Sequence, residues 1–236
     1  MNINVIDLFA GCGGLIDGFL QTGKYNTLAA VDWELATVQT LKKRLITKWN
    51  YDLDCNNILH FDIQRTEELI NGFEDPKYGK SEGLHNIIGN KKNDLIVGGP
   101  PCQAYSLVGR ARDKDGMKND PRNFLYKEYA KFLKKYEPKV FVFENVRGLI
   151  TAEKGLYFKN MQAYFKRIGY ELAYTIQNSE DFGVLQKRRR IILIGWQKGS
   201  GFKYPEFEIV KENFTVSQIL SDLKKLKPGE QNNVTK

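Results

Sequence analysis

The sequence predicts an α/β fold in which a mostly parallel sheet is covered by helices on both faces. Two observations carry this prediction. Short apolar runs of strand length alternate along the chain with stretches whose apolar residues recur at helical spacing. The strand-like runs are also apolar almost throughout, which is typical of strands that are buried on both sides. A chain of 236 residues is long enough to bury a core around such a sheet.

Each half of the chain supplies part of this alternation. In the first half, strands are predicted at 3–9, 27–32, 58–61 and 94–97, with helices at 15–21 and 35–49. In the second half, helices are predicted at 122–136 and 156–168, with strands at 139–143, 171–176 and 190–196. Residues 75–93 are rich in Gly, Lys and Asn and are predicted to be a surface insertion, and 103–121 a long loop.

The C-terminal part has a different composition. From Gly199 the chain is lysine-rich and only weakly periodic, with one possible helix at 215–226 and a disordered tail from Gly229. We therefore expect a catalytic and cofactor-binding domain at 1–198 and a C-terminal extension at 199–236.

The bulk composition excludes several classes of protein. No apolar run approaches the roughly 18 residues of a membrane helix, and no signal peptide is visible, so a cytoplasmic protein is expected. Three cysteines and two histidines, without a Cys-x-x-Cys pair, predict neither a disulfide framework nor a metal site. Lys and Arg exceed Asp and Glu by 36 to 28, which suits either solubility or a polyanionic partner such as nucleic acid.

Reactive side chains gather at the predicted strand ends. Asp7 ends the first strand, Asp32 the second, Cys102 follows the fourth after a turn, and Glu144 ends the fifth. In open α/β sheets, ligands bind beyond the carboxyl ends of the strands. We therefore expect these four residues to share one site.

A glycine-rich turn, Phe9-Ala10-Gly11-Cys12-Gly13-Gly14, follows the first strand. Glycines allow a ligand to approach the backbone closely. Asp32 lies where an acid meets ribose hydroxyls in nucleotide sites, and Trp33 could stack on an adenine. Ile16 occupies the place of the third glycine of a dinucleotide fingerprint, so the pattern favours an adenosine cofactor. A tight turn with a surface acid and a core tryptophan is the alternative.

Three further segments carry candidate chemistry. Gly98-Gly99-Pro100-Pro101 holds Cys102 rigidly after a buried strand, which favours a reactive thiol over an inert buried one. Glu144 is suited either to proton transfer in catalysis or to an ion pair with a neighbouring arginine. In the run 186–190, Arg188 and Arg190 share one face of the coming strand and could meet phosphate or a base edge; a solvated basic face is the alternative.

Taken in order, these segments resemble the cytosine-5 DNA methyltransferase family. The resemblance runs from Asp7 to Trp196 and rests on four motifs: Asp7-Leu8-Phe9-Ala10-Gly11-Cys12-Gly13-Gly14, Pro100-Pro101-Cys102-Gln103, Glu144-Asn145-Val146 and Gln186-Lys187-Arg188-Arg189-Arg190. It implies a doubly wound, mostly parallel seven-stranded sheet of the S-adenosylmethionine-dependent methyltransferase type. It also implies S-adenosylmethionine as cofactor, no metal, and double-stranded DNA as substrate.

The resemblance assigns roles residue by residue. Cofactor contacts are implied for Phe9, Ala10, Gly11, Gly13, Gly14, Asp32, Trp33, Asp62, Ile63, Pro100 and Leu125. Catalytic roles are implied for Cys102, Glu144, Arg188 and Arg190. Substrate contacts are implied for Pro101, Gln103, Ser106, Asn145 and Gln186.

In this family the thiolate of Cys102 would add to carbon 6 of a flipped-out cytosine, which activates carbon 5 toward the donor's methyl group. Family members continue into a target-recognition domain and a Gly-Asn-Ser segment, and neither is found here. We therefore expect a second polypeptide to supply recognition, or a truncated chain. A tRNA cytosine-5 methyltransferase and a non-catalytic regulatory relative are the rival interpretations.

Overall fold

The computed structural model of the protein describes residues 2–101, 124–210 and 215–230. The strands of these parts are β1 (Ile3–Leu8), β2 (Tyr25–Asp32), β3 (Ile58–His60), β4 (Phe73–Asp75), β5 (Gly79–Ser81), β6 (Leu95–Gly98), β7 (Val140–Val146), β8 (Tyr170–Asn178) and β9 (Arg189–Gln197). The helices are α1 (Gly14–Gln21), α2 (Leu35–Trp49), α3 (Thr66–Asn71), α4 (Gly83–Ile88), α6 (Leu125–Tyr136), α7 (Gly148–Thr151), α8 (Leu156–Arg167) and α9 (Val216–Ile219), with short 3-10 turns at Ala152–Gly155 and Ser179–Asp181.

The predicted mostly parallel, seven-stranded sheet is confirmed. Its strand order is β3-β2-β1-β6-β7-β9-β8. The strands from β3 to β7 run parallel, while β9 is antiparallel to both of its neighbours. From β1 the chain first builds outward through β2 and β3, and then returns to add β6 and β7 on the other side. The gap between the ends of β1 and β6 is therefore a topological switch point, where open α/β sheets bind ligands.

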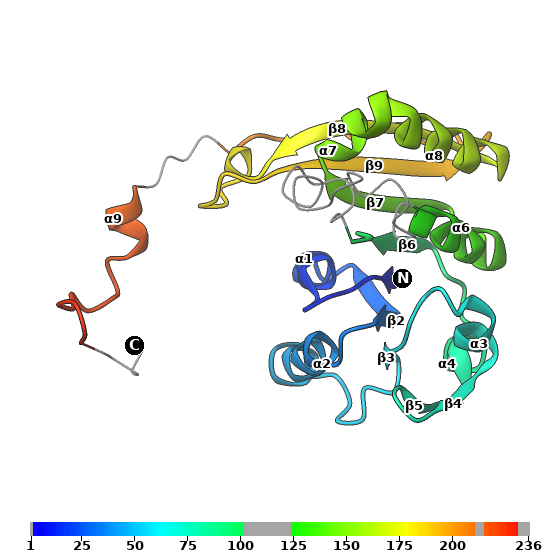
Figure 1. Cartoon of the computed structure of the whole chain (residues 1–236), viewed down its shortest axis with the longest axis horizontal. Helices are drawn as coiled ribbons and strands as arrows, with labels where there is room; N and C mark the ends of the chain where they lie inside the picture. The colour runs from blue at the N-terminus through cyan, green and yellow to red at the C-terminus, as the bar shows by residue number, and fades with distance from the viewer. Residues whose placement is uncertain (1, 102–123, 211–214, 231–236) are drawn as a thin grey trace.

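Helices cover both faces of the sheet (Figure 1). Alternate residues of β1 point to opposite sides. Ile6 and Leu8 belong to the large core cluster that includes residues of α3, α4, α6 and α8. Val5 packs with Val97 of β6 and with Phe19 of α1 on the other face. Since β1 is apolar on both sides, it forms the centre of a sheet rather than an exposed edge.

Helix α2 has the predicted boundaries, and local chemistry accounts for its C-terminal end. Val38, Leu41 and Leu45 form its buried stripe. The helix ends at Asn50, which adopts a left-handed conformation with φ 53°, and the following N–H of Tyr51 returns to the carbonyl oxygen of Leu45. Asparagine tolerates this conformation better than most residues, so it terminates the helix without a glycine.

The prediction that residues 75–93 form a surface insertion is wrong. This stretch contains β5, which pairs with β4 in an antiparallel hairpin, and helix α4, whose Leu84 and Ile88 are buried in the main core. Gly83, which begins α4, has a φ of 86° and packs against the backbone of Gly72. A Cβ atom on Gly83 would lie 2.3 Å from the backbone nitrogen of Gly72. The glycines thus serve close packing, while the apolar residues at helical spacing supply the core.

Several other boundaries shift by a few residues, and two of the differences change the interpretation. Strand β7 was expected to end at residue 143, but pairing with β9 continues to the partners Val146 and Arg190, so Glu144 and Asn145 lie inside the strand. The helix expected at 215–226 is only the single turn of α9, which stands apart from the sheet in Figure 1. Leu220 and Leu223 are about half exposed. Short helices depend on packing of an apolar face, and α9 lacks it among the described residues.

The predicted loop at 103–121 lies outside the described residues. In the parts that are described, no helix is both long and apolar enough to cross a bilayer.

Candidate active site

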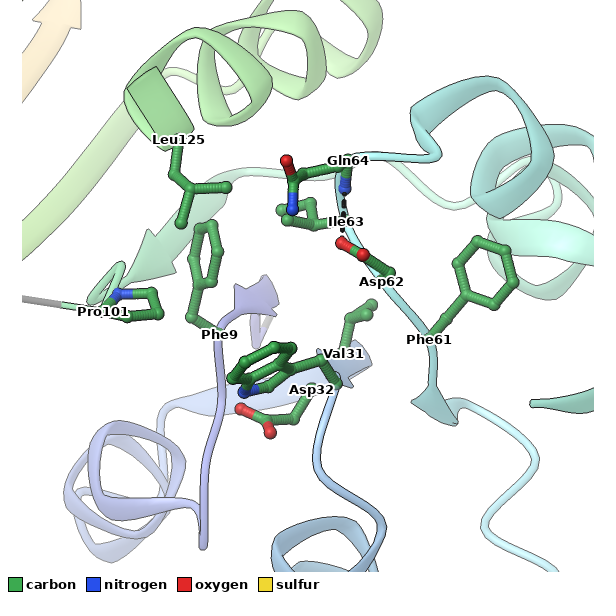
Figure 2. A pocket seen from close by; sticks show the side chains of 10 residues that line it. Phe9, Val31, Asp32, Phe61, Asp62, Ile63, Gln64, Pro101 and Leu125 are labelled. Atoms are coloured by element: carbon green, nitrogen blue, oxygen red, sulfur yellow. Dashed lines mark hydrogen bonds between the residues drawn. The ribbon is translucent and has the colours of Figure 1, made fainter. Parts of the chain in front are cut away.

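A pocket opens at the carboxyl ends of β1, β2, β3 and β6, at the switch point of the sheet. It is lined by Phe9, Val31, Asp32, Trp33, Phe61, Asp62, Ile63, Gln64, Pro101 and Leu125. Figure 2 shows the ring of Phe9 in its middle, with Pro101 and Leu125 beside it and the carboxylates of Asp32 and Asp62 across from them. The fold thus brings together six residues that were predicted to contact the cofactor: Phe9, Asp32, Trp33, Asp62, Ile63 and Leu125.

The turn after β1 is shaped by backbone conformations that few residues adopt. Phe9, Gly11 and Gly13 all have positive φ, at 67°, 53° and 83°. For a phenylalanine this conformation is strained, and such strain is found where structure around a functional site enforces it. A Cβ atom on Gly13 would lie 2.4 Å from Leu41 Cδ1 of α2, so glycine is required there for packing. The turn thereby directs the Phe9 ring into the pocket.

Asp32 links the glycine-rich turn to the start of α2. Its Oδ2 accepts a hydrogen bond from the N–H of Gly11 at 2.8 Å. Its Oδ1 accepts from the N–H of Glu34 at 3.0 Å and from the hydroxyl of Thr37 at 2.9 Å. A carboxylate offers about four acceptor positions. The geometry therefore holds Asp32 rigidly and still leaves acceptor capacity for a ligand hydroxyl.

The opposite wall is suited to an aromatic heterocycle. The Trp33 side chain is 53% exposed, so it is not the core residue of the alternative interpretation and its ring is accessible. Asp62 accepts the N–H of Gln64 on Oδ1 at 3.0 Å, and among the described residues nothing donates to its Oδ2. The pocket thus combines apolar surfaces with two carboxylates, which fits the adenine, ribose and amine of an adenosine cofactor.

Three lining residues were missed by the sequence analysis: Val31, Phe61 and Gln64. Val31 precedes the predicted ribose acid, and the other two flank Asp62 and Ile63. These residues could have been predicted from their positions next to the predicted ones. Where a strand ends and a loop begins, consecutive residues together form the wall of a pocket.

Asp7 does not line this pocket, contrary to the expectation that the four strand-end residues share one site. It is fully buried inside β1, and no described residue donates a hydrogen bond to either carboxylate oxygen. Burial, and secondarily the charge of Asp32, raise the pKa of Asp7 well above its ordinary value. A buried acid of this kind favours its neutral form.

Asp7→Asn is therefore expected to stabilise the free protein at pH 7. A raised folded-state pKa means that the stability of the wild type falls as pH rises through the unfolded-state pKa, because only the unfolded state ionises readily there. Each tenfold change in the acid's dissociation constant corresponds to about 1.4 kcal/mol. We expect a gain of at least about 1 kcal/mol in the free energy of unfolding at pH 7, and a smaller difference below about pH 4.

Urea unfolding of both proteins at the two pH values measures this effect, with the exposed-site variant Asp54→Asn as the control. An Asp7→Asn variant that is less stable than the wild type at pH 7, or equally stabilised at both pH values, would contradict the explanation.

A second cluster lies beside the pocket, where β7 pairs with β9. The Oε1 atom of Glu144 accepts from Arg190 Nε at 2.8 Å, and Arg188 Nη2 lies 3.8 Å from the same oxygen. Both arginines reach one carboxylate oxygen, which confirms that they share a face of β9. The ion pair with a neighbouring arginine, which was the alternative interpretation of Glu144, is therefore present. The Glu144 side chain is 23% exposed, so the carboxylate remains accessible from solvent.

The segment 99–101 joins this cluster to the pocket. Asn145 is buried, and its Nδ2 donates to the carbonyl oxygen of Pro100 at 3.1 Å, which anchors the backbone ahead of Cys102. A Cβ atom on Gly99 would lie 2.8 Å from Glu144 Oε2, so a larger residue here would displace this carboxylate. Pro101 lines the pocket itself. The chain enters residue 102 from a short segment that touches both sites.

Gly99→Ala is expected to lower methyl transfer by about tenfold to a hundredfold, since displacements near 1 Å at a reacting centre have effects of this size. The added methyl group would push Glu144 away from its present position against Arg190. Gly18→Ala is the matched control, because a Cβ atom there meets nothing within 4 Å. Transfer of labelled methyl groups to DNA measures the effect, and full activity of Gly99→Ala would disprove the steric role of Gly99.

The remaining predicted residues are placed as follows. Ala10 is buried in the core and Gly14 is exposed at the start of α1, and neither residue lines the pocket. Gln186 is exposed on the connection between β8 and β9. Cys102, Gln103 and Ser106 lie outside the described residues. In the described part of the chain, no group of three His, Cys, Asp or Glu side chains is arranged to hold a metal ion.

Comparison with known proteins places the chain in a family. The model of the C-5 cytosine-specific DNA methylase family matches residues 3–236, nearly the whole sequence. The chain belongs to this family. Among similar proteins, the Type II methyltransferase M.Bpa9945I of Bacillus paralicheniformis is 37% identical over 96% of this chain and 62% of its own length. The Type II methyltransferase M1.HphI of Haemophilus parahaemolyticus is 31% identical over 98% of this chain and 55% of its own.

Solved structures show the same fold. A methyltransferase encoded within an E. coli prophage superposes with a TM-score of 0.71 at 23% identity, over 95% of this chain and 56% of that one. The Entamoeba histolytica methyltransferase EhMeth superposes with a TM-score of 0.56 at 18% identity, over 90% and 58%. This C-5 cytosine methylase chain therefore spans between half and two thirds of the length of these relatives.

Proposed function

We propose that the protein transfers the methyl group of S-adenosylmethionine to carbon 5 of cytosine in DNA, with Cys102 as the nucleophile. One observation carries this proposal. Residues 99–101 connect a pocket suited to an adenosine cofactor with the Glu144–Arg190 pair, and Cys102 follows directly. The proposal therefore gives the Cys102 thiol a methyl donor and a carboxylate as its partners in the reaction.

The cofactor supplies an electrophilic methyl group on a sulfonium centre. The pocket residues would hold it through its adenosine part: Trp33 against the adenine ring, Asp32 toward the ribose hydroxyls, and Asp62 toward the exocyclic amine. Phe9 and Leu125 close the apolar sides of the pocket. The rigid hydrogen bonding of Asp32 means that little ordering is needed when the ribose binds.

On the cytosine, the thiolate of Cys102 adds to carbon 6, and the electron pair of the carbon 5–carbon 6 double bond moves toward carbon 5. Carbon 5 would then bond to the donor's methyl group while the methyl–sulfonium bond breaks, and its electron pair would stay on the sulfur of the resulting S-adenosylhomocysteine. A general base then removes the proton from carbon 5, and the electron pair left behind restores the double bond as the sulfur–carbon 6 bond breaks and frees the thiolate. Glu144 assists the addition by holding a proton at ring nitrogen 3 and accepting from the exocyclic amine. Arg190, which contacts Glu144 at 2.8 Å, orients this carboxylate and would face the base oxygen.

The reacting carbon is hidden inside a duplex, so the cytosine must be flipped out of the stack, at a cost of a few kcal/mol. A net charge of +8 favours association with the phosphate backbone. We propose further that target recognition is provided by polypeptide outside these 236 residues, either as a second subunit or as a further segment. The share of the relatives' length that the chain spans, 62% and 55%, supports this.

Trapping on DNA that contains 5-fluorocytosine tests the proposal. Fluorine replaces the proton that must leave carbon 5, so the adduct cannot be resolved and a denaturation-resistant protein–DNA complex accumulates. We expect this complex to depend on S-adenosylmethionine and to appear with DNA rather than with tRNA carrying the same base. The assay is run on the chain alone and with any polypeptide that purifies with it. Absence of an adduct in both cases would refute the proposal, and trapping on tRNA alone would favour the rival RNA substrate.

A further inference from the structure

The loop from 61 to 65 carries one whole wall of the pocket. Phe61, Asp62, Ile63 and Gln64 are consecutive lining residues between β3 and α3. Three hydrogen bonds shape the loop: Phe61 N–H to the Asp32 carbonyl at 2.9 Å, Arg65 N–H to the Asp62 carbonyl at 3.0 Å, and Gln64 N–H to Asp62 Oδ1 at 3.0 Å. The position of Asp62 therefore depends on how firmly the end of this loop is held.

Arg65 holds that end by several contacts at once. Its Nη1 donates to Asp75 Oδ2 at 2.6 Å, and its Nε donates to Glu68 Oε1 at 2.8 Å, with a second contact to the same Glu68 carboxylate. The guanidinium also lies 4.8 Å from the centre of the Phe61 ring and 5.8 Å from that of Tyr78. The planar guanidinium of arginine can pair with a carboxylate through two N–H groups and stack on an aromatic ring at the same time. The ammonium group of lysine cannot make this combination of contacts.

The β4–β5 hairpin supports the same wall from behind. Phe73 stacks on Phe61 with ring centres 3.9 Å apart, and Tyr78 packs against Phe61 at 5.0 Å and against His60 at 4.8 Å. His60 Nε2 in turn lies 3.0 Å from the carbonyl oxygen of Trp33. The hairpin thus contacts the neighbours of both Asp62 and Trp33 while lying outside the pocket.

We propose that Arg65, through its ion pair with Asp75 of the β4–β5 hairpin, is a positioning residue that sets the preference of the pocket for adenine over other purines. The inference rests on the proposed cofactor site. A site that distinguishes an amine from a carbonyl does so by placing a fixed acceptor, here Asp62, within hydrogen-bonding distance of the amine. Loosening the loop costs this contact first, because stacking on Trp33 tolerates small shifts and a hydrogen bond does not.

Binding of S-adenosylhomocysteine and of its inosine counterpart, measured by calorimetry on the full chain, tests the inference. The wild type is expected to prefer the adenosine compound. Arg65→Lys and Asp75→Asn are each expected to weaken binding of the adenosine compound by about tenfold, equal to about 1.4 kcal/mol, and that of the inosine compound much less. The preference ratio should fall accordingly.

Asp75→Asn is a selective variant. Oδ1 of Asp75 accepts the N–H groups of Lys77 and Tyr78 at 2.8 and 3.1 Å and orders the hairpin turn, while Oδ2 accepts from Arg65. Asparagine retains the first function and removes the second. Glu74→Gln is the matched control, since Glu74 pairs with Lys80 on the same hairpin and both side chains are more than three-quarters exposed. Its preference ratio should equal that of the wild type.

If Asp75→Asn proves too unstable to measure, Tyr78→Leu removes the ring beneath Arg65 without a change of charge, and the ratio should again fall. Equal weakening of both ligands, or an unchanged ratio in Arg65→Lys, would show that Arg65 serves stability alone and would overturn the inference. A wild type that binds neither compound would instead refute the proposed cofactor site, and this inference with it.

Discussion

Glu144→Gln is expected to lower methyl transfer by about a hundredfold to ten-thousandfold, the range found for loss of a positioned proton donor or acceptor. Glutamine preserves the size of the side chain but cannot hold a proton at ring nitrogen 3 of the cytosine. It also leaves Arg190 without the carboxylate that its Nε contacts at 2.8 Å. Initial rates with labelled S-adenosylmethionine and DNA, at saturating cofactor, measure the loss.

The control for this change is Glu171→Gln. Glu171 lies on β8 and accepts a hydrogen bond from Trp196 Nε1 at 2.9 Å, so it is a paired glutamate of the same sheet that lines no part of the pocket. Cofactor affinity of Glu144→Gln should remain within a few fold of the wild type, because the pocket residues are unchanged. A rate within threefold of the wild type would rule out a catalytic role for Glu144.

Cys102→Ser is expected to abolish both methyl transfer and covalent trapping on 5-fluorocytosine DNA. A hydroxyl is far less acidic than a thiol, so almost no nucleophile would exist near neutral pH. Binding of the cofactor should persist, since the residues that form the pocket up to Pro101 are intact. The predicted signature is therefore normal cofactor affinity together with no adduct.

Cys55→Ala provides the comparison for Cys102→Ser. Cys55 is buried, and its thiol donates to the carbonyl oxygen of Asp52, which is the ordinary structural use of a free cysteine. Burial also raises the pKa of the Cys55 thiol, so it is poorly suited to act as a nucleophile. An adduct that survives Cys102→Ser, or disappears in Cys55→Ala, would mean that the nucleophile has been assigned to the wrong residue.

The local pattern of the sequence was enough for the fold and for much of the pocket. The apolar stripe of 35–49 predicts α2 to the residue, and the buried runs locate the central strands. Asp32 was found because parallel strands end at one edge, so residues that follow different strands meet there. Phe9 and Asp62 were assigned to the pocket by the resemblance to the family. The first inference depends on periodicity and strand direction, and the second on motif order, and both are readable over a few residues.

Where the sequence analysis went wrong, contacts between distant segments decided the result. Residues 75–93 look polar on average, yet Leu84 and Ile88 complete the core because α4, which carries them, packs against α3 and β2. Glu144 seemed to end its strand, yet β9 extends the pairing to Val146. Average composition over a window cannot show which few residues face inward, and pairing with a strand some fifty residues away leaves no local signal.

By itself, the sequence determined that this chain is an α/β protein of the C-5 cytosine methylase family and where α2 and the central strands lie, because strand length, helical spacing and motif order are local properties. Only the tertiary structure decided that Gly99 lies against the Glu144 carboxylate, that Asp7 is buried in the core, and that Arg65 links the pocket wall to Asp75 of the β4–β5 hairpin. Each of these depends on distances between segments that are separate in the chain, and such distances arise only when the sheet is assembled and its helices pack against it.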